Sequence, residues 1–336
     1  MHMPDNYLSP ATCGTMFALA APVVGLSIKK VKVQLNEKKE LAPMLGITSS
    51  LSFLMMMFNV PVPGGTTAHA VGGTLLAILV GPAAACLSVT VALILQAFLF
   101  GDGGILALGA NIFNMACVMP FSGYFIYNFL RKHGHPSLGA ISGSYIGINL
   151  AALFAGIELG IQPLIAHTAN NQPLYNPYPL SVTVPAMMVA HLAVAGWIEA
   201  FFTYVVYRFV KQVAPQELYG SSSVEVSNTK KTNKLKKYFY YFIIVLLILT
   251  PLGLLADGTA FGEWSNSELL ENLKQQHLAN TLPKGMTHGL NYASPFSDYT
   301  IPGTPVSLGY ILSGVSAIII FIIIGKVLTT FYGRKK

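Results

Sequence analysis

The chain has 336 residues, of which 53% are hydrophobic and only 10% charged, and its mean hydropathy is +0.57. Soluble domains carry about 25% charged residues, so this composition excludes a soluble globular protein and indicates a polytopic membrane protein. The apolar runs are long and continuous rather than alternating, which predicts an all-α fold. The net charge of +7 does not indicate nucleic-acid binding, because the cations gather in alternate loops.

Candidate membrane spans follow one another along the whole chain. They lie at about residues 11–28, 42–58, 69–81, 83–100, 105–129, 138–159, 182–207, 238–256 and 307–327. The third is short for a spanning helix, so we expect it to be tilted, interrupted or partly re-entrant. The first seven predict a helical bundle over 1–212, and the last two predict a separate two-span module over 238–336. A polar, Ser-rich, basic segment at 213–237 is the expected cytoplasmic linker.

The placement of the cations predicts the orientation. All Lys and Arg residues except Lys274 and Lys284 fall in 29–40, 131–135, 208–237 and 326–336, which share one side of the membrane. The positive-inside rule makes that side cytoplasmic, so the N-terminus and the start of the third span lie outside, and the C-terminus lies inside. The outer loops lean acidic, which either concentrates cations or reflects ordinary solvation.

The first residues, Met1-His2-Met3, offer unusual ligand geometry. The amine of Met1 and the amide and Nδ1 nitrogens of His2 can close two fused chelate rings on one ion. Such a set favours planar Ni(II) or Cu(II) over tetrahedral Zn(II), and an imidazole such as His69 can fill the fourth place. Alternatively, His2 simply lies in a frayed terminus. Residues 4–6 are polar and acidic rather than basic, so we expect no cleavable signal peptide and a retained Met1.

The segment 60–68, VPVPGGTTA, precedes His69 and contains two prolines and two glycines. This composition predicts a tight, rigid outer loop. The loop either only turns the chain or holds His69 at a set depth below the surface.

Several polar side chains fall inside the apolar spans. Gln96, Asn111 and Asn114 should point into the bundle, either as interhelical hydrogen bonds or as support for a metal-binding imidazole. His191 and Glu199 lie eight residues apart and can share the inward side of one helix. Ionisable residues at such depth are functional candidates, although a neutral core histidine explains His191 equally well.

Motifs for other chemistries are absent from the sequence. It contains no GxxxxGK[ST], HExxH, GxSxG or CxxC spacing. Nothing therefore indicates a P-loop ATPase, an intramembrane zinc protease, a serine hydrolase or a thiol redox pair.

The start MHMPDNYLSP resembles the MHIPDGFLSP start of the CbiM/NikM family, the substrate-capture (S) components of energy-coupling-factor (ECF) importers for cobalt and nickel. PVPGGTTAHAVGGTL, FGDGGILALGANIFNM and AHLAVAGWIEAFFT also resemble family segments in the same order, so the similarity covers about 1–212. The tail resembles, more loosely, the two-span NikN or PDGLE-type module. Met3 and Asn6 depart from the usual isoleucine and glycine, but neither position supplies a required donor.

The resemblance implies that the ion is held by the amine of Met1, the amide and imidazole of His2, and His69. It also implies that a separate transmembrane coupling (T) component and two cytoplasmic ATPases supply the energy. The chain itself would be no enzyme and would hold no resident cofactor, only the transported ion.

We therefore predict a metal-capture component of the cell membrane that imports Ni(II), with Gln96, Asn111 and His191 as candidate support residues. Import of Co(II) for cobalamin synthesis is the alternative, although the planar nitrogen set and the type of tail favour nickel. A self-sufficient secondary transporter or channel that uses His191 and Glu199 also stays open, without a convincing internal repeat to support it. A membrane metalloenzyme is disfavoured because the four donors leave no open position.

Overall fold

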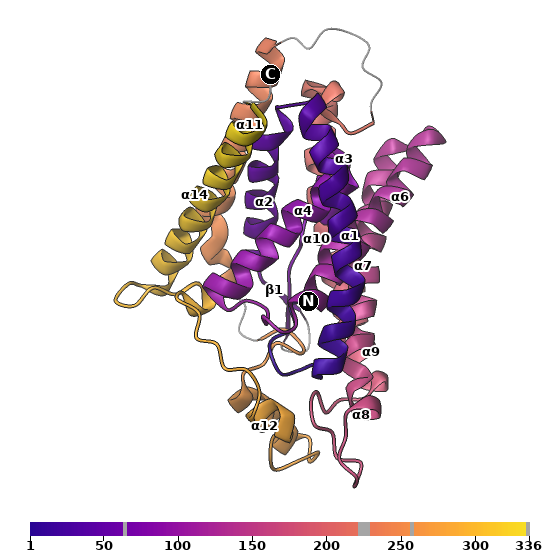
Figure 1. Ribbon diagram of the computed structural model, residues 1–336, viewed down its shortest axis with the longest axis vertical. Helices are drawn as coiled ribbons and strands as arrows, with labels where there is room; N and C mark the ends of the chain where they lie inside the picture. The colour runs from indigo at the N-terminus through magenta and orange to yellow at the C-terminus, as the bar shows by residue number, and fades with distance from the viewer. Residues whose placement is uncertain (63–65, 221–228, 256–258, 334–336) are drawn as a thin grey trace.

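The computed structural model describes residues 1–62, 66–220, 229–255 and 259–333. Parts of the expected outer loop (63–65) and linker (221–228), and the cations at 334–336, lie outside the described residues. Within them the chain is an all-α polytopic membrane protein, as the sequence predicts, with one short β-hairpin (Figure 1).

The first half of the chain holds α1 (Pro10–Glu37), α2 (Leu41–Met57), β1 (Val60–Val62), β2 (Thr66–Ala68), α3 (Gly73–Val80), α4 (Pro82–Leu95), the π-helical turn η1 (Gln96–Phe100), α5 (Leu108–Asn111), the π-helical turn η2 (Ile112–Val118), α6 (Met119–Lys132) and α7 (Pro136–Gly160). The second half holds α8 (Gln162–Ile165), α9 (Leu180–Ala190), the π-helical turn η3 (His191–Ala195), α10 (Gly196–Val213), η4 (Pro215–Glu217), α11 (Thr229–Leu249), η5 (Thr250–Leu255), α12 (Asn266–Gln275), α13 (Lys284–Thr287), η6 (Ser297–Tyr299) and α14 (Val306–Gly333).

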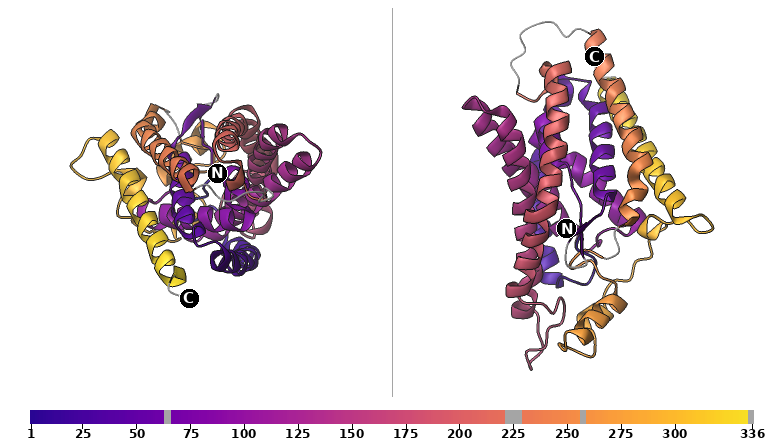
Figure 2. Two further views of the ribbon diagram at one scale, coloured as in Figure 1. Left: turned by 90° about the horizontal axis from the view of Figure 1, so that it is seen from above. Right: turned by 180° about the vertical axis from the view of Figure 1, so that it is seen from behind.

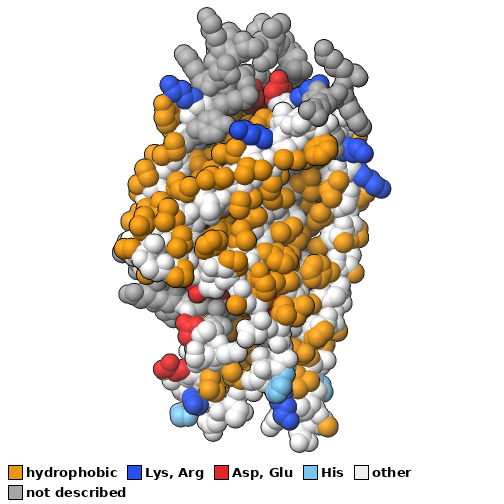
Figure 3. Space-filling model, turned by 60° about the vertical axis from the view of Figure 1, so that its left-hand side comes forward, with side chains coloured by type: hydrophobic (Ala, Val, Ile, Leu, Met, Phe, Trp, Pro, Cys, Tyr) orange, Lys and Arg blue, Asp and Glu red, His pale blue; other side chains and the backbone are white. Residues whose placement is uncertain are grey.

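Five of the described helical segments are long and apolar enough to cross a membrane. They are Pro10–Glu37, Pro82–Phe100, Pro136–Ile165, Leu180–Val213 and Val306–Phe331, and the shorter apolar helices are Leu41–Met57 and Tyr241–Leu254. The space-filling view shows a broad hydrophobic belt, with most of the visible Lys and Arg side chains at one end (Figure 3).

Three expected boundaries differ from the structure. The third span was expected from residue 69, but α3 begins only at Gly73, and His69 lies in an extended segment after β2. The basic stretch 29–40 was expected as a connection, yet α1 continues to Glu37 because lysines are good helix formers. For the same reason α11 begins at Thr229, inside the expected linker.

The N-terminal segment folds back into the bundle. Ser9 caps α1, its side chain accepting a hydrogen bond from the Thr12 amide, and residues 1–8 then run inward, so that the N-terminus lies among the helices (Figures 1 and 2). Strands β1 and β2 pair antiparallel, with Val60 opposite Ala68.

The two C-terminal helices pack against the bundle. Helix α14 lies along α2, where a Cβ added to Gly46 would stand 2.7 Å from the carbonyl oxygen of Phe321. Small residues permit such close approach of membrane helices. Residues 259–305, which include α12, lie below the bundle in Figure 1, at the end where the N-terminus enters.

Candidate metal centre

The first three residues are among the most buried in the chain. Met1 is 4% exposed, His2 is 3% and Met3 is 1%, so the alternative of a frayed terminus is wrong. The Met3 amide donates to Asn111 Oδ1 at 2.8 Å, and Asn111 Nδ2 donates back to the Met3 carbonyl at 3.1 Å. The Gly104 amide donates to the same carbonyl at 2.8 Å. Asn111 therefore binds both backbone polar groups of Met3, the residue next to His2.

The glycine turn after η1 makes room for this segment. A Cβ on Gly104 would stand 2.3 Å from the Asp5 amide nitrogen, a distance that no side chain tolerates. The Asp5 carboxylate in turn accepts hydrogen bonds from the amides of Ile105 and Leu106, at 3.0 and 2.7 Å. The backbone of the turn thus packs directly against the backbone of the N-terminal segment.

His69 is presented by the extended segment after β2. Its Nδ1 lies 3.1 Å from the Ala70 carbonyl, which assigns the proton to Nδ1 and leaves the lone pair on Nε2, the nitrogen that faces His2. Beyond it, the buried carboxylate of Glu199 accepts hydrogen bonds from the amides of Val71 and Gly72. Gly72 has a φ of +79°, in the left-handed region that glycine adopts without strain.

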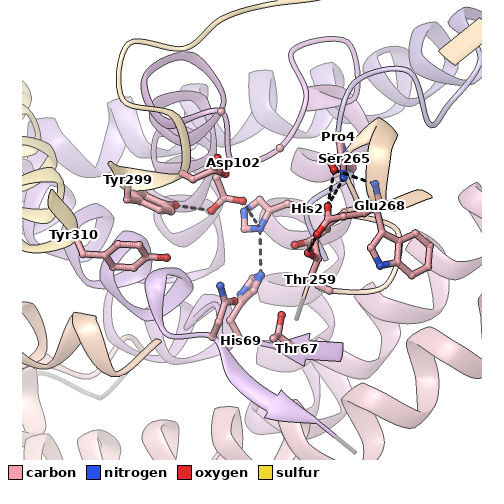
Figure 4. A pocket seen from close by; sticks show the side chains of 17 residues that line it. His2, Pro4, Thr67, His69, Asp102, Thr259, Ser265, Glu268, Tyr299 and Tyr310 are labelled. Carbon is pink, nitrogen blue, oxygen red and sulfur yellow. Dashed lines mark hydrogen bonds and ion pairs between the residues drawn. The ribbon is translucent and has the colours of Figure 1, made fainter. Parts of the chain in front are cut away.

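The two histidines meet at their ligand nitrogens. His2 Nδ1 lies 3.1 Å from His69 Nε2, and the rings stack with centroids 4.9 Å apart (Figure 4). Two nitrogens that bind one ion at about 2 Å and at right angles stand about 2.9 Å apart. The spacing therefore fits neighbouring positions around one metal ion.

Both imidazoles are neutral in this setting. Burial first, and then the nearby Met1 amine, lowers the pKa of His2 from 6.5 to about 4. The same two causes, in the same order, and the His2 ring hold the pKa of His69 well below its usual value. A neutral ring keeps its lone pair, so both side chains are ready to bind a cation near neutral pH.

A polar network flanks both ring nitrogens of His2. Gln96 Oε1 lies 3.3 Å from His2 Nε2, and Asp102 Oδ1 lies 3.3 Å from His2 Nδ1. Gln96 Nε2 donates to Asp102 and to the hydroxyl oxygen of Tyr299, at 3.1 and 2.9 Å, while that hydroxyl donates to Asp102 at 2.5 Å. Burial raises the pKa of Asp102, and the hydrogen bonds from Tyr299 and Gln96 oppose that effect. The sequence offered Gln96 as a support residue but no role for Tyr299.

A carboxylate from the C-terminal half faces the terminal amine. Glu263 Oε1 lies 2.8 Å from the Met1 nitrogen, in an ion pair whose amine is fully buried. One donor atom each of Glu263, His2 and His69 lies within 4.8 Å of the other two. The sequence placed Glu263 in an acidic outer segment without assigning it a role. The Gly-Glu-Trp stretch at 262–264 was the available signal.

The remaining candidates lie around this cluster. His191 begins η3 and its Nδ1 lies 2.7 Å from the Met187 carbonyl, one turn back in its own helix. Asn114 donates to the buried carboxylate of Glu158 at 2.9 Å rather than to the histidines. Gln96 begins η1 and Asn111 immediately precedes η2, so all three predicted support residues stand at π-helical turns, which are frequent at functional sites.

A cavity of about 510 Å³ opens in front of the two histidines. Its lining contains several carboxylates, and the two halves of the chain contribute to it about equally (Figure 4). The carboxylate residues in it are Asp102, Glu263, Glu268 and Asp298. A cleft lined by carboxylates concentrates cations next to the imidazoles.

Comparisons with known proteins identify the family of the chain. Residues 2–217 match the family described as "Cobalt uptake substrate-specific transmembrane region" (CbiM), and residues 235–334 match the PDGLE domain. The chain is 56% identical over 324 residues to "Probable fused nickel transport protein LarMN" of Lactiplantibacillus plantarum, covering 96% of each chain. It is 37% identical over 340 residues to "Fused nickel transport protein NikMN" of Rhodobacter capsulatus, covering 96% of this chain and 95% of that protein.

A solved structure is similar as well. "Crystal Structure of an Truncated Transition metal Transporter" is 54% identical and has a TM-score of 0.60, with 63% of this chain and 99% of that chain covered. The chain therefore belongs to the CbiM family of cobalt uptake substrate-specific transmembrane regions, and a PDGLE domain follows the CbiM region in the sequence.

Proposed function

We propose that this chain captures Ni(II) from outside the cell membrane and is the metal-specific component of an ECF importer. More broadly, it is a membrane component of nickel or cobalt transport and not an enzyme. The observation that carries the proposal is the 3.1 Å approach of His2 Nδ1 to His69 Nε2 beside the buried Met1 amine.

The ligand set explains the choice of ion. The amine of Met1, the deprotonated amide and Nδ1 of His2, and Nε2 of His69 make four nitrogen donors in one plane. Planar nitrogen coordination favours Ni(II) or Cu(II) over ions that prefer tetrahedral or octahedral sites. The relatives named as nickel transport proteins support nickel, and Co(II) is the alternative cargo.

The metal site itself determines neither the energy source for transport nor the orientation of the chain in the membrane. The sequence contains no phosphate-binding loop, so a T component and two cytoplasmic ATPases would drive transport. The concentration of Lys and Arg on one side supports an outer N-terminus and a cytoplasmic C-terminus. Cells that lack the ATPases should take up no nickel through this chain, whereas a self-sufficient transporter would still import it.

The decisive experiment compares Ni(II) and Co(II) binding to the purified chain with its native Met1 and to a chain extended by two residues before Met1. The extension removes the chelating amine, so we expect it to abolish tight binding. His2→Ala and His69→Ala should do the same while the chain still folds. The exposed outer-loop variant His167→Ala is the matched control and should bind like the unaltered chain. Equal binding by native and extended chains would refute the site, and the more tightly bound ion names the cargo.

A further inference from the structure

The outer segment of the PDGLE domain holds the N-terminal segment by several hydrogen bonds. The Tyr7 hydroxyl donates to the Trp264 carbonyl at 2.8 Å. Asn6 Nδ2 donates to the Leu290 carbonyl at 2.8 Å, and the Leu290 amide donates back to Asn6 Oδ1 at 2.9 Å. The PDGLE domain therefore touches the backbone and side chains next to the candidate ligands, not only the lipid-embedded helices.

Glu263 extends this contact into the metal site itself. Its carboxylate is 2.8 Å from the Met1 nitrogen, and it lies within 4.8 Å of ligand nitrogens of His2 and His69. A donor on the open face is at right angles to every donor in the plane and stands about 3.0 Å from it when each bond is about 2.1 Å long. The contact between Glu263 and the Met1 nitrogen already has this length, and binding would draw the carboxylate closer to the two imidazole nitrogens.

The chemistry of a planar nitrogen set leaves room for such a group. Four donors in one plane leave the two faces of the ion open, and the cavity that contains Glu263 opens beside the histidines. A divalent ion keeps one excess positive charge after the single negative amide nitrogen has bound. A buried excess charge is costly unless an opposite charge lies next to it.

We propose that Glu263 is a fifth metal ligand, an oxygen donor that the PDGLE domain supplies to the open face of the nitrogen site. This inference rests on the proposed function, because it needs the planar site of Met1, His2 and His69. In the metal-free chain the same carboxylate holds the terminal amine in place. The PDGLE domain thus takes part in binding the ion directly.

The other cavity carboxylates are engaged differently. Asp102 accepts hydrogen bonds from Tyr299 and Gln96. Glu268 accepts from the side chain and amide of Ser265, forming the capping box of α12. Asp102 Oδ1 also lies 3.3 Å from His2 Nδ1, but Glu263 contacts the terminal amine and is, among the described residues, the carboxylate that groups with both imidazoles.

Nickel K-edge absorption of the full chain, purified with its native Met1 and loaded with Ni(II), tests the coordination number. A four-coordinate planar ion gives a sharp pre-edge feature that a fifth ligand suppresses. We expect a weak feature in the unaltered chain and a strong one in Glu263→Ala. Affinity should fall about tenfold, as is typical when a supporting group of a metal site is lost.

Two further variants separate the loss of the Glu263 ligand from a change in side-chain size or in net charge. Glu263→Gln keeps the size of the side chain and removes its charge, so it should show the planar feature and fold like the unaltered chain. Glu271→Gln removes one charge from the exposed face of α12, in the same domain but outside the cavity lining, and should change neither spectrum nor affinity.

The outcomes separate the two proposals. If the unaltered chain and Glu263→Ala both show the planar feature, the fifth ligand is refuted even if the affinity differs, because Glu263 then only positions the amine. The nitrogen site stands in that case, provided that His2→Ala still abolishes binding. If the unaltered chain binds no Ni(II), the proposed function fails and the fifth ligand fails with it.

Discussion

The carboxylate of Glu199 in α10 anchors the backbone at Gly72, three residues beyond His69. Its Oε2 accepts hydrogen bonds from the amides of Val71 and Gly72 at 2.9 and 3.0 Å, and the side chain is fully buried. The sequence offered Glu199 as part of an ion or proton relay. Its observed partners favour a structural task instead, which is to fix the extended segment that presents His69.

Glu199→Ala should therefore weaken Ni(II) binding without removing a ligand. The change leaves two buried amides without an acceptor, which costs about 1–3 kcal/mol for each. We expect at least a tenfold loss of affinity, or about 1.4 kcal/mol, by titration with Ni(II). Glu199→Gln keeps one oxygen acceptor and should lose less. The control is Glu158→Gln, which removes another buried carboxylate whose partner is Asn114. An equal loss of affinity in Glu158→Gln would contradict the anchoring role.

Gly104→Ala should displace the N-terminal segment. The added methyl would stand 2.3 Å from the Asp5 amide nitrogen, and backbone cannot yield as a flexible side chain does. We expect the Ni(II) affinity to fall at least about tenfold, because the displaced N-terminal backbone carries the Met1 amine and His2 out of position. Gly14→Ala is the control, because no described residue beyond its neighbours in the chain comes within 4 Å of its added methyl. Unchanged binding in Gly104→Ala would show that the turn does not position the ligands.

The metal-free chain should lose stability as the pH falls from about 6.5 to about 4. His2 has a folded pKa of about 4 against 6.5 in the unfolded chain, so the unfolded state binds more protons within this window. The expected loss from His2 is about 3 kcal/mol across the window, and His69 adds a loss in the same direction. Thermal unfolding at several pH values measures this effect. His2→Ala should show a shallower decline, and an identical decline would exclude His2 as a cause.

Gly46→Ala should loosen the docking of α14 on α2. A methyl at this position would stand 2.7 Å from the Phe321 carbonyl oxygen, so the two helices must separate. We expect a lower midpoint of thermal unfolding, because overpacking a core typically costs about 1–3 kcal/mol of folding free energy. Gly25→Ala should leave the midpoint unchanged, because in the part of the chain that the structure describes no other segment comes within 4 Å of the added methyl. A midpoint as high in Gly46→Ala as in the unaltered chain would mean that α14 does not depend on this contact.

Much of this protein follows from the sequence alone. Composition and long apolar runs determine an all-α membrane protein, because lipid forces backbone groups to be satisfied within helices. The start Met1-His2 and the position of His69 after a Pro- and Gly-rich loop indicate a nitrogen metal site, since these are local features of chain and chemistry. The helix boundaries were less accurate. The third span begins later than its apolar pattern predicts. Glu199 holds the backbone amides of Val71 and Gly72, so residues 69–72 stay extended and the helix begins only at Gly73.

Only the tertiary structure decided what surrounds the histidines. Glu263 reaches the Met1 amine across 262 positions of the chain, and Tyr299 reaches Asp102 across 197. No local pattern encodes such contacts, because they depend on how α14 packs on α2 and where the outer segment then lies. The burial of the first three residues is decided in the same way. A terminus is ordered only when distant segments, here the turn at 101–104 and the PDGLE domain, supply enough contacts to offset its conformational entropy.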